Sequence, residues 1–300
     1  MDNTKMYCIQ AITPLHVGTG RGVGFIDMPI MREKVTNWPL VPGSAVKGVM
    51  RDHFSERGSP DQKKLINVAF GKEVLDQAGD DSSNSGSLIL TDAHIVCLPI
   101  RSLYGTFAYA TSPLVLKRLG RDLEATEFRD VPATPIVPVD NVILVSKGSR
   151  LVVNDKEGDK VFFEDLDFKA KPDEETAKWA EALSKFLFSK DTVWQAIFKE
   201  RFAIVSDDVF NFLAENGTEV SAHVRIEDDK KIVAKGALWY EESLPAEAIL
   251  AGIAWCDRAY GGNGIKEKQI LDTYCSGPDL DLQIGGKATV GKGRIRCIFS

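Results

Sequence analysis

Two ionisable side chains near the start of the chain suit acid–base chemistry on a bound ligand. His16 and Asp27 stand on either side of the segment GTGRGVG, whose four glycines allow the backbone to approach a ligand closely. A histidine exchanges protons near neutral pH, and a carboxylate takes up a proton or holds a divalent cation. This stretch therefore predicts a catalytic site at Asp27, with His16 as a second candidate.

Structural roles for both side chains stay open on the sequence alone. Asp27 has apolar neighbours on both sides, where a carboxylate needs a compensating partner, so an ion pair with Arg21 or Arg32 is the alternative. His16 also stands between apolar residues. A lone histidine in that setting is more often a hydrogen-bonded core residue than a catalytic one.

A second motif, PGSAVKGVMR, has the features of an anion site at the start of a helix. Gly43 and Ser44 stand at the expected helix start, and Lys47 and Arg51 follow one and two turns along it. Free amides, a hydroxyl and two cations suit a phosphate group. Capping of the helix by Ser44 is a sufficient structural explanation of the serine, so the two cations carry the functional interpretation.

A third motif, IGGKATVGKGR, lies near the end of the chain at residues 284–294. Gly285, Gly286, Lys287, Lys292 and Arg294 could form an anion site lined by backbone amides. The segment lacks the Gly-Lys-Ser/Thr ending of a Walker loop, and no helix follows it as in a dinucleotide-binding turn. A hairpin loop packed beside the first strand is the alternative, and the basic residues favour contact with RNA or phosphate.

Two β-type runs, EVSAHVRI and GALWYEE, predict a long hairpin over residues 219–242. Its arms carry His223, Arg225, Trp239 and Tyr240, which could stack on nucleic-acid bases or wedge between them. Aromatic packing across the two strands explains Trp239 and Tyr240 equally well.

Composition limits the class of protein. The chain has 300 residues and 44% hydrophobic content, enough for the core of one large domain or two smaller ones. We find no apolar run long enough to span a membrane and no signal-peptide features at the start, so we expect a cytoplasmic protein. The five cysteines are scattered without CxxC spacing, which indicates neither a disulfide framework nor a zinc site.

The net charge of −6 argues against a protein that coats nucleic acid with its whole surface. The charge is unevenly distributed, however, because residues 101–121 and 285–296 each contain basic side chains and no acidic ones. Such tracts could hold an anionic ligand along one face, or could simply be solvated surfaces.

Strands and helices alternate along the chain. Period-two and apolar runs predict strands at residues 6–13, 87–91, 93–98, 141–145, 151–153, 161–163, 203–205 and 249–255, the hairpin, and a strand, loop and strand at the end. Helical periodicity predicts helices at 44–54, 60–71, 113–123 and 265–274, between 172 and 201, and after Ser206. This order favours an α+β fold around a mostly antiparallel sheet.

Taken together, the motifs resemble the backbone subunit of the type III-B (Cmr) CRISPR effector complex, a family within the RAMP superfamily. The resemblance rests on TPLHVGTGRGVGFIDMPIMREK, PLVPGSAVKGVMR, VSDDVF, GALWYEESLP and IGGKATVGKGR, which follow one another in the same order, and it is weaker between residues 155 and 200. It implies a modified ferredoxin-like (RRM-like) palm with helical insertions and a protruding β-hairpin thumb. In this single RAMP domain the palm would span about 1–206 and 247–300, with a helical insertion at about 172–201, and the thumb about 207–246.

The resemblance also implies a function. Such a subunit stacks head to tail with copies of itself along a CRISPR guide RNA, beside other Cmr subunits, and acts in antiviral defence as an endoribonuclease that cleaves complementary target RNA at regular intervals. Asp27 falls on the family's catalytic aspartate, which would hold Mg²⁺ or Mn²⁺ transiently with an RNA phosphate. His16 matches a loop histidine of the family.

Further residues take RNA-binding roles by the same resemblance. The residues that would grip RNA are Arg21, Gly43, Ser44, Lys47, Arg51, Gly285, Gly286, Lys287, Lys292 and Arg294. The thumb, with His223, Arg225, Trp239 and Tyr240, would interrupt the guide–target duplex. Two alternatives are an architectural RNA-binding subunit that leaves the cutting to another protein, and a stand-alone enzyme with a phosphate-bearing substrate, which would not account for the long hairpin.

Overall fold

The structure is a computed structural model that describes residues 3–20, 22, 24, 26–55, 60–71, 85–126, 128, 130–226, 233–260 and 264–300. One predicted RNA-binding residue, Arg21, lies outside these described residues. Among them, no helix is both long and apolar enough to cross a membrane.

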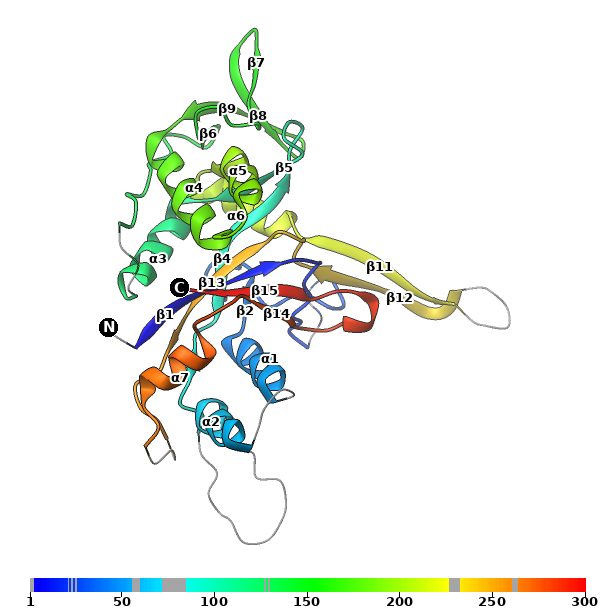
Figure 1. Ribbon diagram of the computed structural model, residues 1–300. Helices are drawn as coiled ribbons and strands as arrows, with labels where there is room; N and C mark the ends of the chain where they lie inside the picture. Colours follow the sequence, from blue (N-terminus) through cyan, green and yellow to red (C-terminus); the bar gives the residue numbers. More distant parts are fainter. Residues whose placement is uncertain are drawn as a thin grey trace.

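A single large sheet forms the body of the molecule, in the strand order β14-β15-β1-β13-β4-β5-β10-β6-β9-β8-β7 (Figure 1). Its first part contains β1 (Thr4–Ala11), β2 (Leu40–Val41), β3 (Ile89–Leu90), β4 (Ala93–Arg101), β5 (Phe107–Thr111), β13 (Ile249–Trp255), β14 (Leu280–Gln283) and β15 (Arg294–Phe299). The second part contains β6 (Val142–Val145), β7 (Val153–Asp155), β8 (Gly158–Phe163), β9 (Leu166–Pro172) and β10 (Phe202–Ile204). Only the β5–β10 and β6–β9 pairs are parallel among the paired strands, so the predicted α+β class with a mostly antiparallel sheet is confirmed.

Helices cover both faces of this sheet. They are α1 (Gly43–Ser55), α2 (Pro60–Phe70), α3 (Pro113–Glu124), α4 (Glu174–Leu187), α5 (Thr192–Arg201), α6 (Asp207–Asn216) and α7 (Glu267–Tyr274). The first strand shows the consequence, because Tyr7 and Ile9 belong to one apolar cluster, and Met6 and Cys8 belong to the other. A period of two is typical of a half-buried strand, but this strand is covered on both faces.

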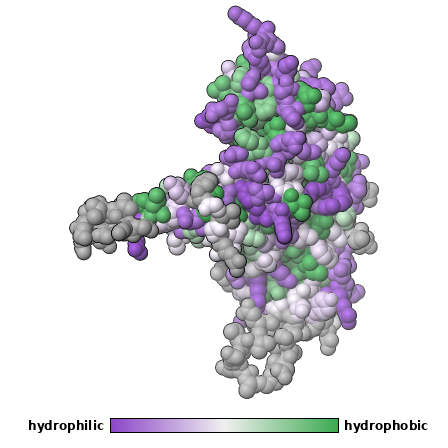
Figure 2. All heavy atoms as spheres, turned by 180° about the vertical axis from the view of Figure 1, so that it is seen from behind, coloured by the Kyte–Doolittle hydropathy of each residue, from purple (hydrophilic) through white to green (hydrophobic). Residues whose placement is uncertain are grey.

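The chain between β10 and β13 forms a separate two-stranded sheet. The chain between β1 and β2 contacts the root of this sheet. This hairpin, β11 (Glu219–Ile226) and β12 (Val233–Ser243), projects sideways from the body (Figure 1). Ala222 pairs with Tyr240 and Val224 with Leu238, so these side chains share one exposed face, and Figure 2 shows apolar side chains on the projecting arm. His223, Trp239 and Glu241 lie on the opposite face.

Candidate functional site

The opening loop is the segment of residues 15–32, and its described residues pair with β12 and Leu244 at the root of the hairpin through Leu15 and Met28. Leu15 and Leu244 exchange two backbone hydrogen bonds of 2.8 and 2.9 Å. Further along, the Met28 amide donates to the Tyr240 carbonyl and the Glu242 amide donates to the Met28 carbonyl, both at 3.0 Å. The loop therefore acts as an additional partner strand that fixes the residues it carries relative to the hairpin.

Asp27 is the exposed carboxylate of this loop. Its Oδ2 accepts a hydrogen bond of 2.8 Å from the backbone N–H of Tyr240. The expectation of an apolar, buried setting is wrong, because the side chain reaches solvent. The alternative of an ion pair with Arg32 is also wrong, since that guanidinium contacts Glu242, while Arg21 lies outside the described residues.

His16 is buried, with 4% of its surface exposed. Its Nδ1 lies 2.6 Å from the carbonyl oxygen of Glu242, which can only accept, so Nδ1 carries a proton. Its own carbonyl accepts from the Gly286 amide at 2.9 Å. Nε2 faces Gly18, where an added Cβ would lie 2.8 Å away. The structure thus gives the hydrogen-bonded core histidine of the alternative interpretation, held on the same strand that holds Asp27.

Glu241 is a buried carboxylate that the sequence analysis did not single out. It is 0% exposed and lies on the face of β12 that looks towards residues 284–294. Lys292 Nζ donates to Oε1 at 2.7 Å and to the Ser243 hydroxyl at 3.0 Å, and Lys287 Nζ lies 3.4 Å from Oε2. Two of the predicted RNA-binding lysines therefore neutralise a carboxylate of their own chain.

The charges around Glu241 keep it ionised. Burial by itself would raise the pKa of the Glu241 carboxyl, but the hydrogen bond from Lys292 and the charges of Lys292, Lys287 and His16 lower that pKa below its ordinary value. The signal for this residue was present in the run WYEES. Adjacent strand residues point to opposite faces, so the two glutamates lie on opposite sides of β12, and both sides are covered here.

Three polar atoms beside Glu241 have no hydrogen-bond partner within the described part of the chain: Oε2 of Glu241, Nε2 of His223 and Nε1 of Trp239. The His223 and Trp239 rings are stacked at 5.6 Å between centroids, and Lys287 Nζ lies 5.9 Å from the Trp239 ring. Glu241 Oε2 lies 3.4 Å from Lys287 Nζ and 3.9 Å from His223 Nε2, so these groups have ionic neighbours but hydrogen-bonding capacity left over. Arg225 is exposed at the β-bulge further along β11.

The glycine-rich loop before β15 packs against the opening loop. A Cβ added at Gly285 would lie 2.2 Å from the carbonyl oxygen of His16, so glycine is required there by contact with the protein's own backbone. Arg294 is exposed and its amide donates to the Thr13 hydroxyl at 3.0 Å. The alternative of a hairpin loop packed beside the first strand describes this geometry.

The start of α1 differs from its prediction. The helix begins at Gly43, so Ser44 is an exposed helical residue and does not cap it. The Gly43 amide donates to Asp92 Oδ1 at 2.9 Å, which means that this amide is already occupied. Lys47 Nζ donates to the Leu88 carbonyl at 2.6 Å, and burial lowers the pKa of Lys47. The Gly43 amide and the Lys47 ammonium predicted to bind a phosphate are thus both engaged by the protein itself.

The donor set limits the kind of metal site that could form here. Within the described ranges, no cluster of three or more His, Cys, Asp or Glu side chains could hold a metal ion, and all five cysteines are buried and free. Asp27 offers one exposed carboxylate. That set fits an ion shared with a substrate phosphate and several waters, as Mg²⁺ prefers, and does not fit an ion held by the protein alone.

Comparison with known proteins gives consistent relatives. The family model described as the RAMP superfamily matches residues 8–296. The chain is similar to the CRISPR system Cmr endoribonuclease Cmr4 of Pyrococcus furiosus, with 34% identity over 300 residues that cover 96% of this chain and 92% of the relative.

Solved structures share the fold. The crystal structure of oligomeric Cmr4 from Pyrococcus furiosus matches with a TM-score of 0.71 and 27% identity, covering 99% of this chain and 98% of that one. The cryo-EM structure of the type III-B Cmr-beta complex bound to cognate target RNA contains a chain that matches with a TM-score of 0.72, 18% identity, and coverage of 99% and 96%. At that lower identity the match speaks for the fold alone.

Proposed function

Because the chain belongs to the RAMP superfamily, and a Cmr endoribonuclease is 34% identical to it, we propose that it is the RNA-cleaving backbone subunit of a type III-B CRISPR effector complex. It binds guide RNA, stacks head to tail with copies of itself beside other Cmr subunits in the cytoplasm, and cuts complementary target RNA at regular intervals. The exposed Asp27 carboxylate at the root of a projecting hairpin carries this proposal.

The body of the molecule is then the modified ferredoxin-like palm, and the hairpin β11–β12 is the thumb. Its apolar face, with Val220, Val224, Leu238 and Tyr240 exposed, is suited to displace one nucleotide from a stacked duplex. Tyr240 connects the two roles, because its ring lies on this face while its amide holds Asp27. A nucleotide displaced by the thumb would therefore leave its phosphate next to the Asp27 carboxylate.

Cleavage needs little beyond geometry and charge. If the ribose 2′-hydroxyl attacks the adjacent phosphate, a 2′,3′-cyclic phosphate forms as the bond from phosphorus to the 5′-oxygen breaks, and the leaving 5′-oxygen takes a proton from water. The protein then has to hold the reacting atoms in line, help to remove the 2′ proton and offset the developing negative charge. Asp27 accepts the proton, and the exposed Arg294 supplies positive charge on the neighbouring loop, while Lys287 and Lys292 would have to leave Glu241 to contribute. A Mg²⁺ or Mn²⁺ ion bound between Asp27 and the RNA phosphate would add further charge neutralisation.

His16 has a supporting role in this proposal. Because the Nδ1 proton is committed to the Glu242 carbonyl and the ring is buried, His16 orients the strand that holds Asp27. A role in proton transfer would require Nε2 to reach the RNA past Gly18.

Substitution of Asp27 by Asn in the assembled complex tests the proposal. We expect target RNA cleavage to fall by at least about 100-fold, because the acceptor of the proton and the anionic metal ligand are both lost. Binding of target RNA should stay within about twofold, since Asn keeps an acceptor for the Tyr240 amide. The matched control is Asp281→Asn, an exposed aspartate on β14, which should leave cleavage unchanged.

A second arm of the experiment treats the wild-type complex with a chelator, which should stop cleavage without releasing target RNA. Unchanged cleavage by the Asp27→Asn complex would contradict the proposal and favour an architectural subunit. In that case Lys47→Ala or Lys292→Ala would impair assembly while Asp27 was neutral.

A further inference from the structure

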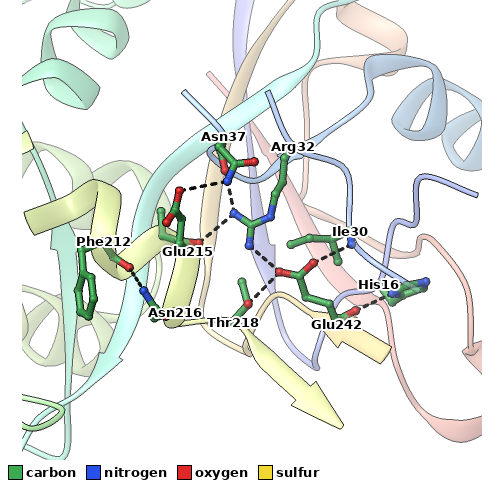
Figure 3. A network of polar contacts seen from close by, with 10 residues as sticks. His16, Ile30, Arg32, Asn37, Phe212, Glu215, Asn216, Thr218 and Glu242 are labelled. Carbon is green, nitrogen blue, oxygen red and sulfur yellow. Dashed lines mark hydrogen bonds and ion pairs between the residues drawn. The ribbon is translucent and has the colours of Figure 1, made fainter. Parts of the chain in front are cut away.

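Glu242 lies on the hairpin and contacts several residues of the opening loop (Figure 3). Its side chain is almost fully enclosed, with 2% of the residue exposed. Oε1 accepts from Arg32 Nη2 at 2.5 Å and from the Thr218 hydroxyl at 2.9 Å, and Oε2 accepts from the Ile30 amide at 3.0 Å. All the donors around this carboxylate thus come from the opening loop and from the start of the hairpin.

The backbone of the same residue also contacts the opening loop. Its amide donates to the Met28 carbonyl at 3.0 Å, and its carbonyl accepts from His16 Nδ1 at 2.6 Å. Through its main chain and side chain together, Glu242 therefore contacts Met28 next to Asp27, Ile30 and Arg32 three and five residues beyond Asp27, and His16.

Arg32 extends the network towards the body of the molecule. Its Nη1 donates to the Asn37 carbonyl at 2.8 Å and to the Ala214 carbonyl near the end of α6 at 3.0 Å. Asn37 in turn donates to Glu215 on the same helix at 3.2 Å. A shift of Arg32 would consequently move the opening loop relative to both the hairpin and the helix that precedes it.

From this geometry we propose that Glu242 and Arg32 form a positioning pair for the cleavage site. The inference rests on the proposed function and adds to it that the pair sets the position of the Asp27 segment relative to the thumb. Neither residue touches RNA in this account. Asp27 itself is exposed and is fixed by one amide, so its position depends on the packing of residues 28–32 against β12.

A carboxylate is required at position 242 for a chemical reason. Both of its oxygens face donors, so a glutamine there must turn its NH₂ group towards either the Arg32 guanidinium or the Ile30 amide. Either orientation puts donor against donor and leaves the partly buried Arg32 guanidinium without its counter-charge. The segment must then move, and a displacement of about 1 Å at a reacting group can lower a rate by about 100-fold.

The test is Glu242→Gln in the assembled complex, with single-turnover cleavage at saturating target RNA measured beside target affinity. We expect the cleavage rate to fall by about 10- to 100-fold while the affinity changes by less than about twofold. Arg32→Lys is the second variant, because it keeps the charge but cannot span Glu242 and the two carbonyls. It should produce the same separation of rate from affinity, in a chain that remains folded.

The matched control is Glu33→Gln, which removes the neighbouring ion pair with Arg118, bonded at 2.8 Å, without touching β12. We expect it to lower the melting temperature and to leave the cleavage rate unchanged. If Glu242→Gln and Arg32→Lys slow cleavage only as much as Glu33→Gln does at equal loss of stability, the pair is merely structural and the inference is wrong. Normal cleavage by both variants, with Asp27→Asn inactive, would overturn the inference and leave the proposed function intact.

Discussion

Two adjacent glutamates on β12 form ion pairs on opposite sides of the strand at the root of the hairpin. Glu241 faces Lys287 and Lys292 on one side of the strand, and Glu242 faces Arg32 on the other. Buried carboxylates of this kind are stable only while their cations remain in place. The lysines expected to bind RNA are therefore engaged in the free chain, and an RNA phosphate would have to compete with Glu241 for them.

Substitution of Lys292 by Ala should destabilise the chain by roughly 3 kcal/mol at pH 7, because it leaves the buried Glu241 with its more distant lysine alone. The matched control is Lys185→Ala, whose ion pair with Glu181 is exposed and should contribute less than about 1 kcal/mol. Urea unfolding of both variants against the wild type measures the difference.

The difference in the free energy of unfolding between wild type and Lys292→Ala should depend on pH, and the pKa of Glu241 gives its sign. The pKa of Glu241 is lowered in the folded chain, so its contribution is complete above the pKa of an unfolded glutamate, about 4.3, and is lost as the pH falls through the folded value. The difference in the free energy of unfolding between wild type and Lys292→Ala should accordingly become smaller as the pH falls from 7 to 3. A difference that stays constant over this range would show that Lys292 acts by packing and not by charge.

The loop between β14 and β15 connects the C-terminal strands to the candidate site, where the Gly286 amide bonds the His16 carbonyl. Gly291 and Gly293 both have positive φ, of 84° and 81°. A Cβ at Gly291 would meet no atom within 4 Å, whereas a Cβ at Gly293 would lie 2.1 Å from the Ile284 carbonyl oxygen. An alanine at Gly291 therefore measures the free-energy cost of a left-handed backbone alone, and an alanine at Gly293 measures that cost together with a steric clash.

Gly291→Ala should lower the free energy of unfolding by about 1 kcal/mol, the usual cost of a left-handed non-glycine residue. Gly293→Ala should lower it by clearly more and should also weaken RNA binding, since the backbone that carries Lys287 and Lys292 must move to relieve the clash with the Ile284 carbonyl. Thermal unfolding and RNA titration of the two variants provide the comparison. Equal effects would contradict the close packing described for this loop.

Several elements could be predicted from the sequence because their signals are local. The hairpin was expected at residues 219–242 and spans Glu219–Ile226 and Val233–Ser243. The helix expected at 113–123 spans Pro113–Glu124, and Ser112 caps it. By contrast, β5 (Phe107–Thr111) and β9 (Leu166–Pro172) were not expected. The run FAYAT is short and buried, with no alternation of apolar and polar side chains. LDFKAKP does alternate apolar and charged side chains, so its signal was present in the sequence and was overlooked.

The candidate site could be predicted only in part, for a related reason. Glycine-rich segments and ionisable residues are visible in the sequence, and they led to the opening loop and to residues 284–294. Which partner each side chain takes depends on tertiary contacts between distant segments. Asp92 bonds the Gly43 amide, and Glu241 attracts the lysines, across 49 and 51 residues of chain.

At the scale of the whole molecule, a broad two-part sheet covered by helices carries one arm that projects sideways (Figure 1). An arm of this kind reaches beyond its own body, so a stack of copies would place each thumb over the next palm. In the proposed assembly the spacing of the copies sets the spacing of the cuts. The number of cuts in a long target RNA should then equal the number of complete thumb-to-palm junctions.

The most direct test of the central claim is a structure of the assembled complex with guide RNA and a target RNA that carries 2′-deoxy sugars at the cleavage positions. We expect one displaced target nucleotide per copy, with its phosphate within hydrogen-bonding reach of Asp27, about 3 Å directly or through one water or ion. Phosphates that stay beyond such contact at every copy, with Asp27 facing solvent, would contradict the account.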